Sequence, residues 1–306
     1  MKKKVRILCF GEAMVELSAL DFANKSSQIG FAGDTLNTAI YLKRLFGSRA
    51  QVDYLTVLGR DLFSEQLKKY IDSENVGTGC IRQTTSRSVG LYAISIDSVG
   101  ERQFSYWRDQ SAARLLFDHD DDFVPLCAYD LVYFSGISLA ILHETARDKL
   151  FRHFERQRRN FKIAFDSNYR PNLWKNKKTA QLNIQRAFNL CDIALPSLDD
   201  QMKLLNVRNE AAVVSWFKDN EIKQTILKRG AKGPRLIGKV NQHCDFGSQL
   251  HVIDSTAAGD GFNAGYLAAY FNGKSDFQSA RHGHELAKIV ISYLGAICPR
   301  NALPSV

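Results

Sequence analysis

Residues 254–273, DSTAAGDGFNAGYLAAYFNG, place a run of small residues directly before a carboxylate at the start of a predicted helix. Ala257, Ala258 and Gly259 allow the backbone to turn tightly, so that N–H groups at the helix start converge on one point. Such a cradle binds an anion, for example a phosphate group. Asp260 follows at the mouth of the predicted cradle.

Two interpretations of Asp260 fit the local sequence. An isolated Asp at a helix start usually caps the helix or lies in its first turn. A carboxylate beside a phosphate cradle could instead act as a general base, taking the proton from a hydroxyl group that attacks the γ-phosphate of a nucleotide. The chain lacks the P-loop and the protein-kinase motifs, so phosphate would be held mainly by this loop.

Short apolar runs alternate with amphipathic segments along the chain. Strands are predicted at residues 5–10, 52–58, 131–134, 162–165, 193–195 and 225–227. Helices are predicted near residues 34–46, 61–73, 143–159, 179–190, 198–205, 209–220, 258–272 and 275–294. Continuously apolar strands separated by helices indicate an α/β fold, with a mainly parallel central sheet flanked by helices.

One region departs from this alternation. Residues 89–97 and 102–107 are consecutive strands, which predicts an antiparallel hairpin with aromatic side chains. No linker, repeat or low-complexity segment divides the chain. We therefore expect a single domain over residues 1–306, with a small antiparallel β lid contributed from about 13–33 and 88–108.

The composition excludes several classes of protein. The 306 residues are 45% hydrophobic and 24% charged, which excludes intrinsic disorder. No stretch approaches the ~20 apolar residues of a membrane span, and the N-terminal apolar run is too short for a signal peptide, so we expect a cytoplasmic protein. The cysteines show no metal-ligand spacing, and no metal site is predicted. A net charge of +9 favours small anionic partners; without a nucleic-acid-binding motif, we expect neither nucleic acid nor a membrane.

The 254–273 run resembles the C-terminal signature of the PfkB (ribokinase-like) carbohydrate kinases, including its Ala-Ala-Gly-Asp core. The resemblance implies a ribokinase-like fold. It also implies that the backbone of residues 257–260 forms an anion hole and that Asp260 is the catalytic base.

Residues 31–47 resemble the N-terminal Gly-Gly-x-x-x-Asn element of the same family, with Ala32 in place of its first glycine. The resemblance implies that Gly33, Asp34 and Asn37 hold sugar hydroxyls. An ordinary turn that caps the next helix would also explain Gly33 and Asp34, but not Asn37.

Within the family, residues 34–38 (DTLNT) are similar to the form found in 2-keto-3-deoxygluconate kinases. Further similar segments are GLY at 90–92, YWR at 106–108, SGISLAIL at 135–142 and NYRP at 168–171. The resemblance continues to GAICPR at 295–300, so it covers nearly the whole chain. It implies transfer of the γ-phosphate of ATP to the terminal hydroxyl of an acid sugar.

This sugar carries a carboxylate, which ribose and fructose lack, and a guanidinium can bind a planar carboxylate with two hydrogen bonds. Arg108 is the first candidate and Arg170 the second, although Arg170 could equally contact nucleotide phosphates. Arg108 could also be an exposed edge-strand charge that prevents aggregation. Because a neutral sugar offers no partner to a buried guanidinium, Arg108 should separate an acid-sugar kinase from a fructokinase or ribokinase. Tyr92 and Tyr106 would add hydroxyls and ring faces, although such residues are more often packing residues.

Nucleotide contacts are expected from the second half of the chain. Residues 228–233 (KRGAKG) resemble the turn that borders the ATP site in the family, although a solvated basic turn would look the same. The resemblance implies ATP contacts from Asn168, Ser197, Lys228, Gly230, Gly233 and His284. The Asn-x-x-Glu element of the magnesium–phosphate network is replaced by SLDD at 197–200. We therefore expect Mg²⁺ to be held mainly through ATP phosphates and water, with a monovalent cation as a further candidate.

The resemblance thus implies an ATP-dependent kinase that phosphorylates 2-keto-3-deoxygluconate. The alternative within the family is a fructokinase or ribokinase. The alternative from another class is a non-catalytic sugar- or nucleic-acid-binding regulator on the same fold, but a pure binding module has no need for a base at Asp260. We expect a homo-oligomer.

Overall fold

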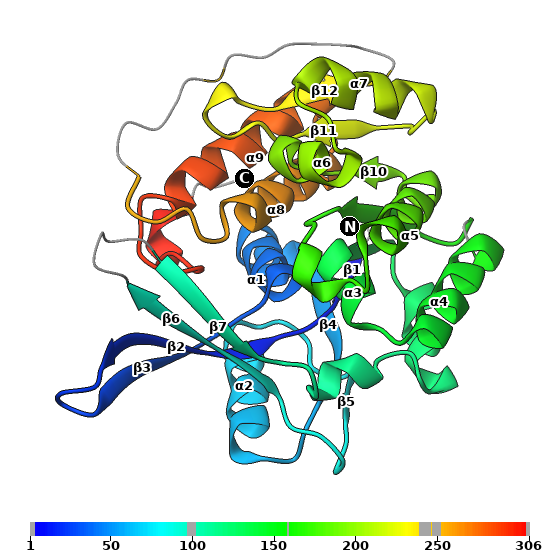
Figure 1. Ribbon diagram of the computed structural model, residues 1–306. Coiled ribbons are helices and arrows are strands. Elements are labelled where there is room, and N and C mark those ends of the chain that lie inside the picture. Colours follow the sequence, from blue (N-terminus) through cyan, green and yellow to red (C-terminus); the bar gives the residue numbers. More distant parts are fainter. Residues whose placement is uncertain (1–3, 97–101, 158, 239–245, 247–251, 304–306) are drawn as a thin grey trace.

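An eight-stranded sheet forms the centre of the molecule (Figure 1). The computed structural model describes residues 4–96, 102–157, 159–238, 246 and 252–303. Across the sheet the strands are β12 (Arg235–Ile237), β11 (Thr225–Leu227), β10 (Ile193–Ala194), β9 (Lys162–Asp166), β8 (Leu131–Ser135), β1 (Val5–Phe10), β4 (Ala50–Leu58) and β5 (Ile81–Gln83). All neighbours are parallel except β11 and β12 at one edge. The expected mainly parallel sheet is confirmed.

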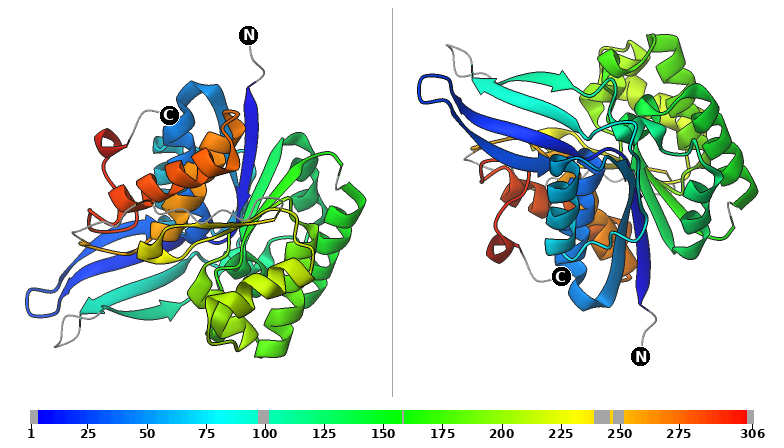
Figure 2. Two further views of the ribbon diagram at one scale, coloured as in Figure 1. Left: turned by 90° about the horizontal axis from the view of Figure 1, so that it is seen from above. Right: turned by 90° about the horizontal axis from the view of Figure 1, so that it is seen from below.

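Helices cover both faces of this sheet (Figure 2). One face carries α1 (Asp34–Phe46), α2 (Leu62–Ser73), α8 (Ala258–Phe271) and α9 (Asp276–Val290). The other carries α3 (Gly136–Ile141), α4 (Glu144–Gln157), α5 (Lys177–Leu190), α6 (Leu198–Leu205) and α7 (Glu210–Asp219). Short 3₁₀ helices lie at residues 47–49, 112–115, 120–128, 171–173, 230–232 and 300–302.

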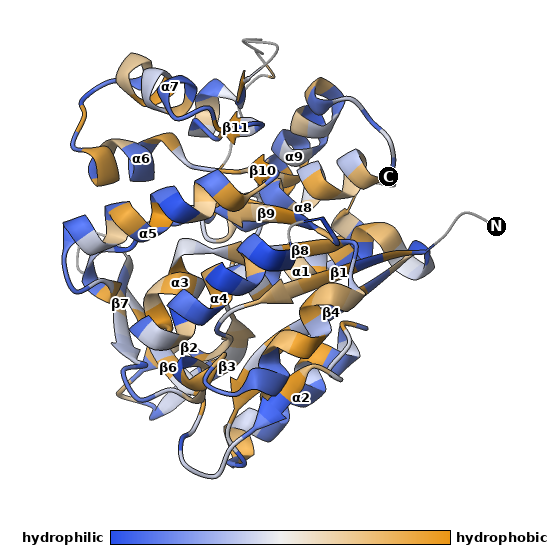
Figure 3. Ribbon diagram, turned by 90° about the vertical axis from the view of Figure 1, so that its right-hand side faces the viewer, coloured by the Kyte–Doolittle hydropathy of each residue, from blue (hydrophilic) through white to orange (hydrophobic). Residues whose placement is uncertain are grey.

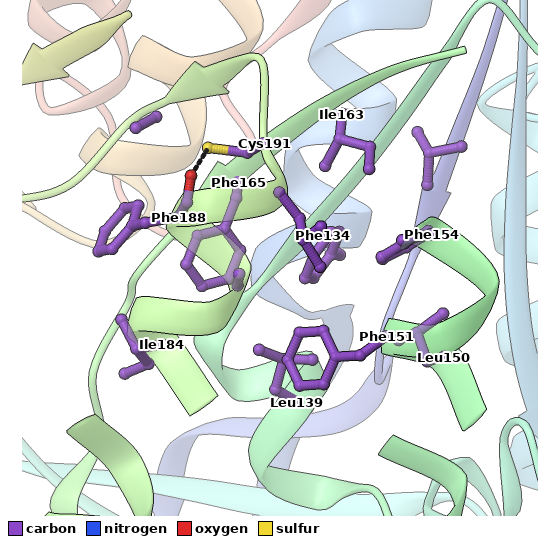
Figure 4. Close-up of a cluster of buried hydrophobic side chains, with 14 of the residues drawn as sticks. Phe134, Leu139, Leu150, Phe151, Phe154, Ile163, Phe165, Ile184, Phe188 and Cys191 are labelled. Carbon is purple, nitrogen blue, oxygen red and sulfur yellow. Dashed lines mark hydrogen bonds between the residues drawn. The ribbon is translucent and has the colours of Figure 1, made fainter. Parts of the chain in front are cut away.

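The side chains of β1 show how the two helical layers share one sheet. Ile7 and Cys9 pack among residues of α1 and α8, whereas Leu8 and Phe10 point to the opposite face, as alternation along a strand requires. Phe134 of β8 lies within the buried cluster of that face, near Phe154 and Phe165 (Figure 4). Its ring centroid lies 4.8 Å from that of Phe10. The strands are accordingly apolar, while polar residues mark the outer side of α4 and α5 (Figure 3).

A second, small sheet projects from this body (Figure 2). Its strands are, in order, β3 (Ser26–Ala32), β2 (Met14–Asp21), β6 (Gly90–Ile96) and β7 (Arg102–Trp107). The β2–β3 and β6–β7 pairs are antiparallel, as predicted, but the central β2–β6 pair is parallel. Helix α1, strand β4, helix α2 and strand β5 separate the two strand pairs in sequence, and the β2–β6 pairing joins them in one sheet. The predicted connection at 98–101 lies outside the described residues.

Most predicted elements coincide with observed ones, and the differences concern short segments. Strand β12, strand β5 and helix α3 were not predicted. Each has six residues or fewer. Among the described residues, no helix is both long enough and apolar enough to cross a membrane.

Helices α8 and α9 approach each other through glycines. A Cβ atom on Gly265 would lie 2.8 Å from the carbonyl oxygen of His282 and 2.9 Å from the Cα of Gly283. A Cβ on Gly283 would lie 2.7 Å from the carbonyl oxygen of Phe262. Because these neighbours are backbone atoms, they cannot rotate away. The contact holds the start of α8, which carries Asp260, against the rest of the body.

We predict that Gly265→Ala lowers the free energy of unfolding by about 1–3 kcal/mol, because the added methyl overpacks a backbone contact. Gly79→Ala is the matched control: a Cβ there meets no atom within 4 Å, so its change should stay within about 0.5 kcal/mol. Chemical denaturation of both variants measures the difference. Equal stability would show that α8 and α9 can separate without cost.

Candidate active site

A cavity of about 970 Å³ lies where the carboxyl ends of β9, β10 and β11 face the small sheet. Open α/β sheets bind ligands at this edge. The predicted site residues lining it are Gly33, Asp34, Asn37, Tyr92, Tyr106, Arg108, Asn168, Arg170, Ser197, Lys228, Gly230, Ala257, Ala258, Gly259, Asp260 and His284. Gly233 is the one predicted site residue outside this lining.

The small residues before Asp260 form the start of α8. Ala257 caps the helix with a left-handed backbone, φ 59°, and the Ala258 N–H donates to the carbonyl of Ser255 at 3.3 Å. The N–H groups of Gly259 and Asp260 have no acceptor within the helix, as in the first turn of any helix. Both residues line the cavity. This arrangement can hold an anion at the positive end of a 14-residue helix.

Asp260 is 8% exposed and does not cap its own helix. Its Oδ2 accepts a hydrogen bond from Asn37 Nδ2 at 2.9 Å, and its backbone carbonyl accepts one from Thr38 Oγ1 at 3.3 Å. Burial, followed by the negative charge of Asp34, raises the pKa of Asp260 to about 8. The hydrogen bond from Asn37 and the charge of Lys228 oppose this rise. A carboxylate with such a pKa is suited to proton transfer near neutral pH.

Asn168 contacts Asp34, the other carboxylate beside Asp260. Its Nδ2 donates to Asp34 Oδ2 at 2.7 Å, and its backbone N–H donates to Asp166 Oδ1 at 3.1 Å. Burial raises the pKa of Asp34, and hydrogen bonds from Ser135 and Asn168 oppose that effect. The structure therefore groups Asn168 with a residue expected to bind sugar, whereas the sequence grouped it with the nucleotide contacts.

Lys228 lies in a buried polar cluster next to the anion loop. Its Nζ contacts Asp166 Oδ2 at 2.6 Å and donates to Asn263 Oδ1 at 3.0 Å. Asn263 Nδ2 in turn donates to Asp166 at 2.7 Å and to the hydroxyl of Tyr133 at 2.9 Å. A Cβ on Gly259 would lie 3.5 Å from the Lys228 ammonium. The ammonium group is thus held beside the predicted anion site.

Arg108 is buried rather than an exposed edge-strand charge, with 7% of its surface accessible. Its Nη2 donates to Oε2 of Glu12, and its guanidinium lies 5.7 Å from the ring centroid of Tyr106. The argument that a neutral sugar would leave this guanidinium without a partner is wrong, because Glu12 supplies a partner within the protein. On the neighbouring strand, Tyr92 donates its hydroxyl hydrogen to Glu16.

Three further predicted residues, Arg170, Ser197 and His284, line the same cavity. Arg170 is half-exposed and donates to Asp200 at 3.4 Å. Ser197 caps α6 by accepting the Asp200 N–H at 3.2 Å. His284 is buried on α9. No group of three His, Cys, Asp or Glu side chains in the described part of the chain is arranged to hold a metal ion.

Comparison with known proteins identifies the family. The sequence matches the pfkB family carbohydrate kinase profile over residues 4–302. The chain belongs to the pfkB family of carbohydrate kinases. It is 39% identical to the 2-dehydro-3-deoxygluconokinase of Escherichia coli K12 over 316 residues, covering 100% of both chains. It is 37% identical to the protein of the same name from Dickeya dadantii, covering 98% of both.

Solved structures of sugar kinases share the fold. A fructokinase from Vibrio cholerae O395 superimposes with a TM-score of 0.82, covering 99% of this chain and 96% of that chain at 20% identity. The 2-dehydro-3-deoxygluconokinase of Thermotoga maritima gives a TM-score of 0.81, covering 97% and 95% at 18% identity. The predicted ribokinase-like α/β fold is confirmed.

Four polar residues of this site were not predicted from the sequence: Asp166, Asn263, Glu12 and Glu16. Asp166 ends β9 at the sheet edge where ligands bind, and Asn263 follows Asp260 by three residues on the same helix face. Those two positions carried a signal that could have been used. Glu12 and Glu16 carried none, because their partners Arg108 and Tyr92 are more than 70 residues away in sequence.

We predict that Asp260→Asn raises the melting temperature of the ligand-free protein at pH 9. Folding raises the pKa of Asp260 from 3.8 to about 8. The protonated form therefore contributes stability that is full below pH 4 and is lost as the pH rises through about 8. The neutral Asn avoids this loss, so the variant should melt at least about 2 °C higher than wild type at pH 9, and the difference should be smaller at pH 5, where less of the stability has been lost.

Asp121→Asn serves as the control for this melting comparison, because Asp121 is exposed. Its melting temperature should follow that of the wild type at both pH values. A parallel pH dependence for Asp260→Asn and wild type would contradict the raised pKa.

Proposed function

We propose that this chain is a 2-dehydro-3-deoxygluconokinase, which transfers the γ-phosphate of ATP to the 6-hydroxyl of 2-dehydro-3-deoxygluconate (2-keto-3-deoxygluconate). The observation that carries the proposal is full-length identity of 36–39% to four relatives of that name. Fructokinases among the relatives are only 25–26% identical. The neutral-sugar alternative is therefore less well supported.

Asp260 acts as the general base. It takes the proton from the 6-hydroxyl as the oxygen attacks the γ-phosphorus, and the bond to the leaving ADP oxygen breaks. The N–H groups at the start of α8 stabilise the charge on the transferring phosphoryl group. Lys228 lies beside this loop and adds positive charge there.

The sugar chain occupies the part of the cavity lined by Gly33, Asp34 and Asn37. A Cβ on Gly33 would lie 2.3 Å from the carbonyl oxygen of Glu12, so only glycine fits this position. Asn37 already contacts Asp260 and can orient it toward the hydroxyl that reacts. Asp34 accepts hydrogen bonds from further sugar hydroxyls.

The sugar carboxylate is bound by Arg108, with Arg170 as a second cation. Arg170 is half-exposed and only loosely held by Asp200, so it can move toward an anionic ligand. Tyr92 and Tyr106 lie with their ring centroids 5.8 Å apart on the small sheet and border the same space.

ATP occupies the opposite part of the cavity, near Ser197, Lys228, Gly230 and His284, with Asn168 between the two ligands. Gly233 lies in the turn formed by residues 228–233 but does not line the cavity, and its φ of 69° favours glycine. A solved Xylella fastidiosa fructokinase of this fold carries ATP. That likeness supports a nucleotide in this cavity.

Mg²⁺ would be held mainly by ATP phosphates and water. Asp199 and Asp200 line the cavity, and their carboxylate oxygens fit the preference of this ion for oxygen ligands. Mg²⁺ would supply positive charge to the phosphates. The Vibrio cholerae structure contains a potassium ion, which supports a monovalent cation as a second candidate.

We further propose that the chain is one domain, that the small sheet acts as a lid over the sugar, and that the kinase is a cytoplasmic homo-oligomer. ATP as co-substrate supports the location. The lid is supported by the cavity-lining side chains of the small sheet, which include Tyr92, Tyr106 and Arg108.

We predict that Asp260→Asn lowers kcat by about 10²–10⁴-fold, because it removes general-base catalysis. In the wild type, kcat/KM measured with ATP below its KM should rise about tenfold per pH unit and level off above about pH 8, where Asp260 is ionised. Steady-state assays from pH 6 to 9 test both points. A variant that retains more than a third of wild-type kcat would remove Asp260 from the chemical step.

We predict that Arg108→Leu lowers kcat/KM for 2-keto-3-deoxygluconate about tenfold to two-hundredfold, the worth of a charge-assisted hydrogen bond. Any activity on fructose should fall much less. Arg108→Leu leaves the buried Glu12 carboxylate without its partner. The double variant Arg108→Leu/Glu12→Gln controls for this effect, and its kcat/KM should fall in the same way, mainly for the acid sugar. Equal losses on both sugars would assign Arg108 a structural role.

A further inference from the structure

The ion pair between Arg108 and Glu12 joins the two sheets of the molecule at the cavity. Glu12 follows β1 of the central sheet and is 1% exposed, and Arg108 follows β7 of the small sheet. Only Arg108 of the two lines the cavity. Glu12 therefore contacts the guanidinium from behind and leaves its other side toward the ligand space.

Gly90, the first residue of β6, makes room for this pair. A Cβ at position 90 would lie 2.8 Å from Glu12 Oε1, 3.2 Å from Met14 Cγ and 3.3 Å from Arg108 Cβ. The shortest of these contacts is to the tip of a flexible side chain. An alanine could therefore be accommodated without unfolding the strand, but it would displace the carboxylate that holds Arg108 and slightly shift Met14 and Arg108.

The pair is only partly satisfied within the described structure. Glu12 Oε1 and Arg108 Nε are both buried and have no hydrogen-bond partner there. A buried charge without full hydrogen bonding destabilises the folded protein, so stability alone does not explain why this pair is present. The pair can instead fix the direction in which the Arg108 guanidinium points.

We propose that Glu12 and Gly90 are positioning residues, which hold the Arg108 guanidinium in one orientation in the cavity wall before the sugar carboxylate arrives. The inference rests on the proposed function and deepens it, because it assigns the selection of an acid sugar to three residues rather than one. An arginine held in place loses less conformational freedom on binding than a free one. The substrate then meets a preformed site.

Two variants test the positioning role without removing a charge. Gly90→Ala displaces the Glu12 carboxylate, and Glu12→Asp withdraws it by one methylene group. Each should raise KM for 2-keto-3-deoxygluconate about threefold to tenfold, part of the loss expected when a charge-assisted hydrogen bond is broken. The kcat, the KM for ATP and any activity on fructose should stay within about twofold, since neither residue contacts the reacting atoms.

Gly30→Ala is the matched control in the same sheet. A Cβ there would lie 3.5 Å from Glu16 Oε1, an ordinary contact, so its kinetics should match the wild type. Thermal unfolding of each variant separates displaced side chains from an unfolded protein.

A double-variant comparison decides whether the effect passes through Arg108. In an Arg108→Leu background, Gly90→Ala and Glu12→Asp should cause no further rise in KM for the acid sugar. An undiminished rise in that background, an unchanged KM in the folded single variants, or equal losses on acidic and neutral sugars would each overturn the proposal. Wild-type preference for a neutral sugar would overturn the proposed function itself, before any variant is compared.

Discussion

The site depends on holding three carboxylates close together at one cavity. Asp34, Asp166 and Asp260 come from α1, β9 and α8, and their charges oppose one another. Each accepts a hydrogen bond from a different asparagine amide, Asn168 to Asp34, Asn263 to Asp166 and Asn37 to Asp260. An amide stabilises a carboxylate without neutralising it, so the cluster keeps its affinity for protons, hydroxyl groups and cations.

The two sheets contribute different residues to the site. The central sheet and α8 position Lys228, Asp260 and the loop before it, which under the proposed function carry out phosphoryl transfer. The small sheet brings Tyr92, Tyr106 and Arg108 to the cavity wall, and under the proposed function these residues contact the sugar. If these roles hold, substrate preference could change along the small sheet while the start of α8 stays as it is.

Much of this could be predicted from the sequence, because the signals were local. The small residues before Asp260 and the apolar strands are visible without any tertiary information. The Glu12–Arg108 pair could not be predicted, since its members are 96 residues apart and each looks like an ordinary surface charge in its own segment. The parallel pairing of β2 with β6 was missed for the same reason: register between distant segments is set by the fold around them.

The short connection between β1 and β2 sets how the small sheet can move. Strand β1 ends at Phe10 and β2 begins at Met14, so the two sheets are joined here by three residues. Gly11 is closely surrounded, with Thr35 Oγ1 2.4 Å from the position of a Cβ. If the small sheet rotated as a rigid body about this connection, the residues farthest from it would move most and those next to it would move least. Any swing of the small sheet would therefore carry the β2–β3 turn through a wide arc, while Arg108 stayed close to Glu12.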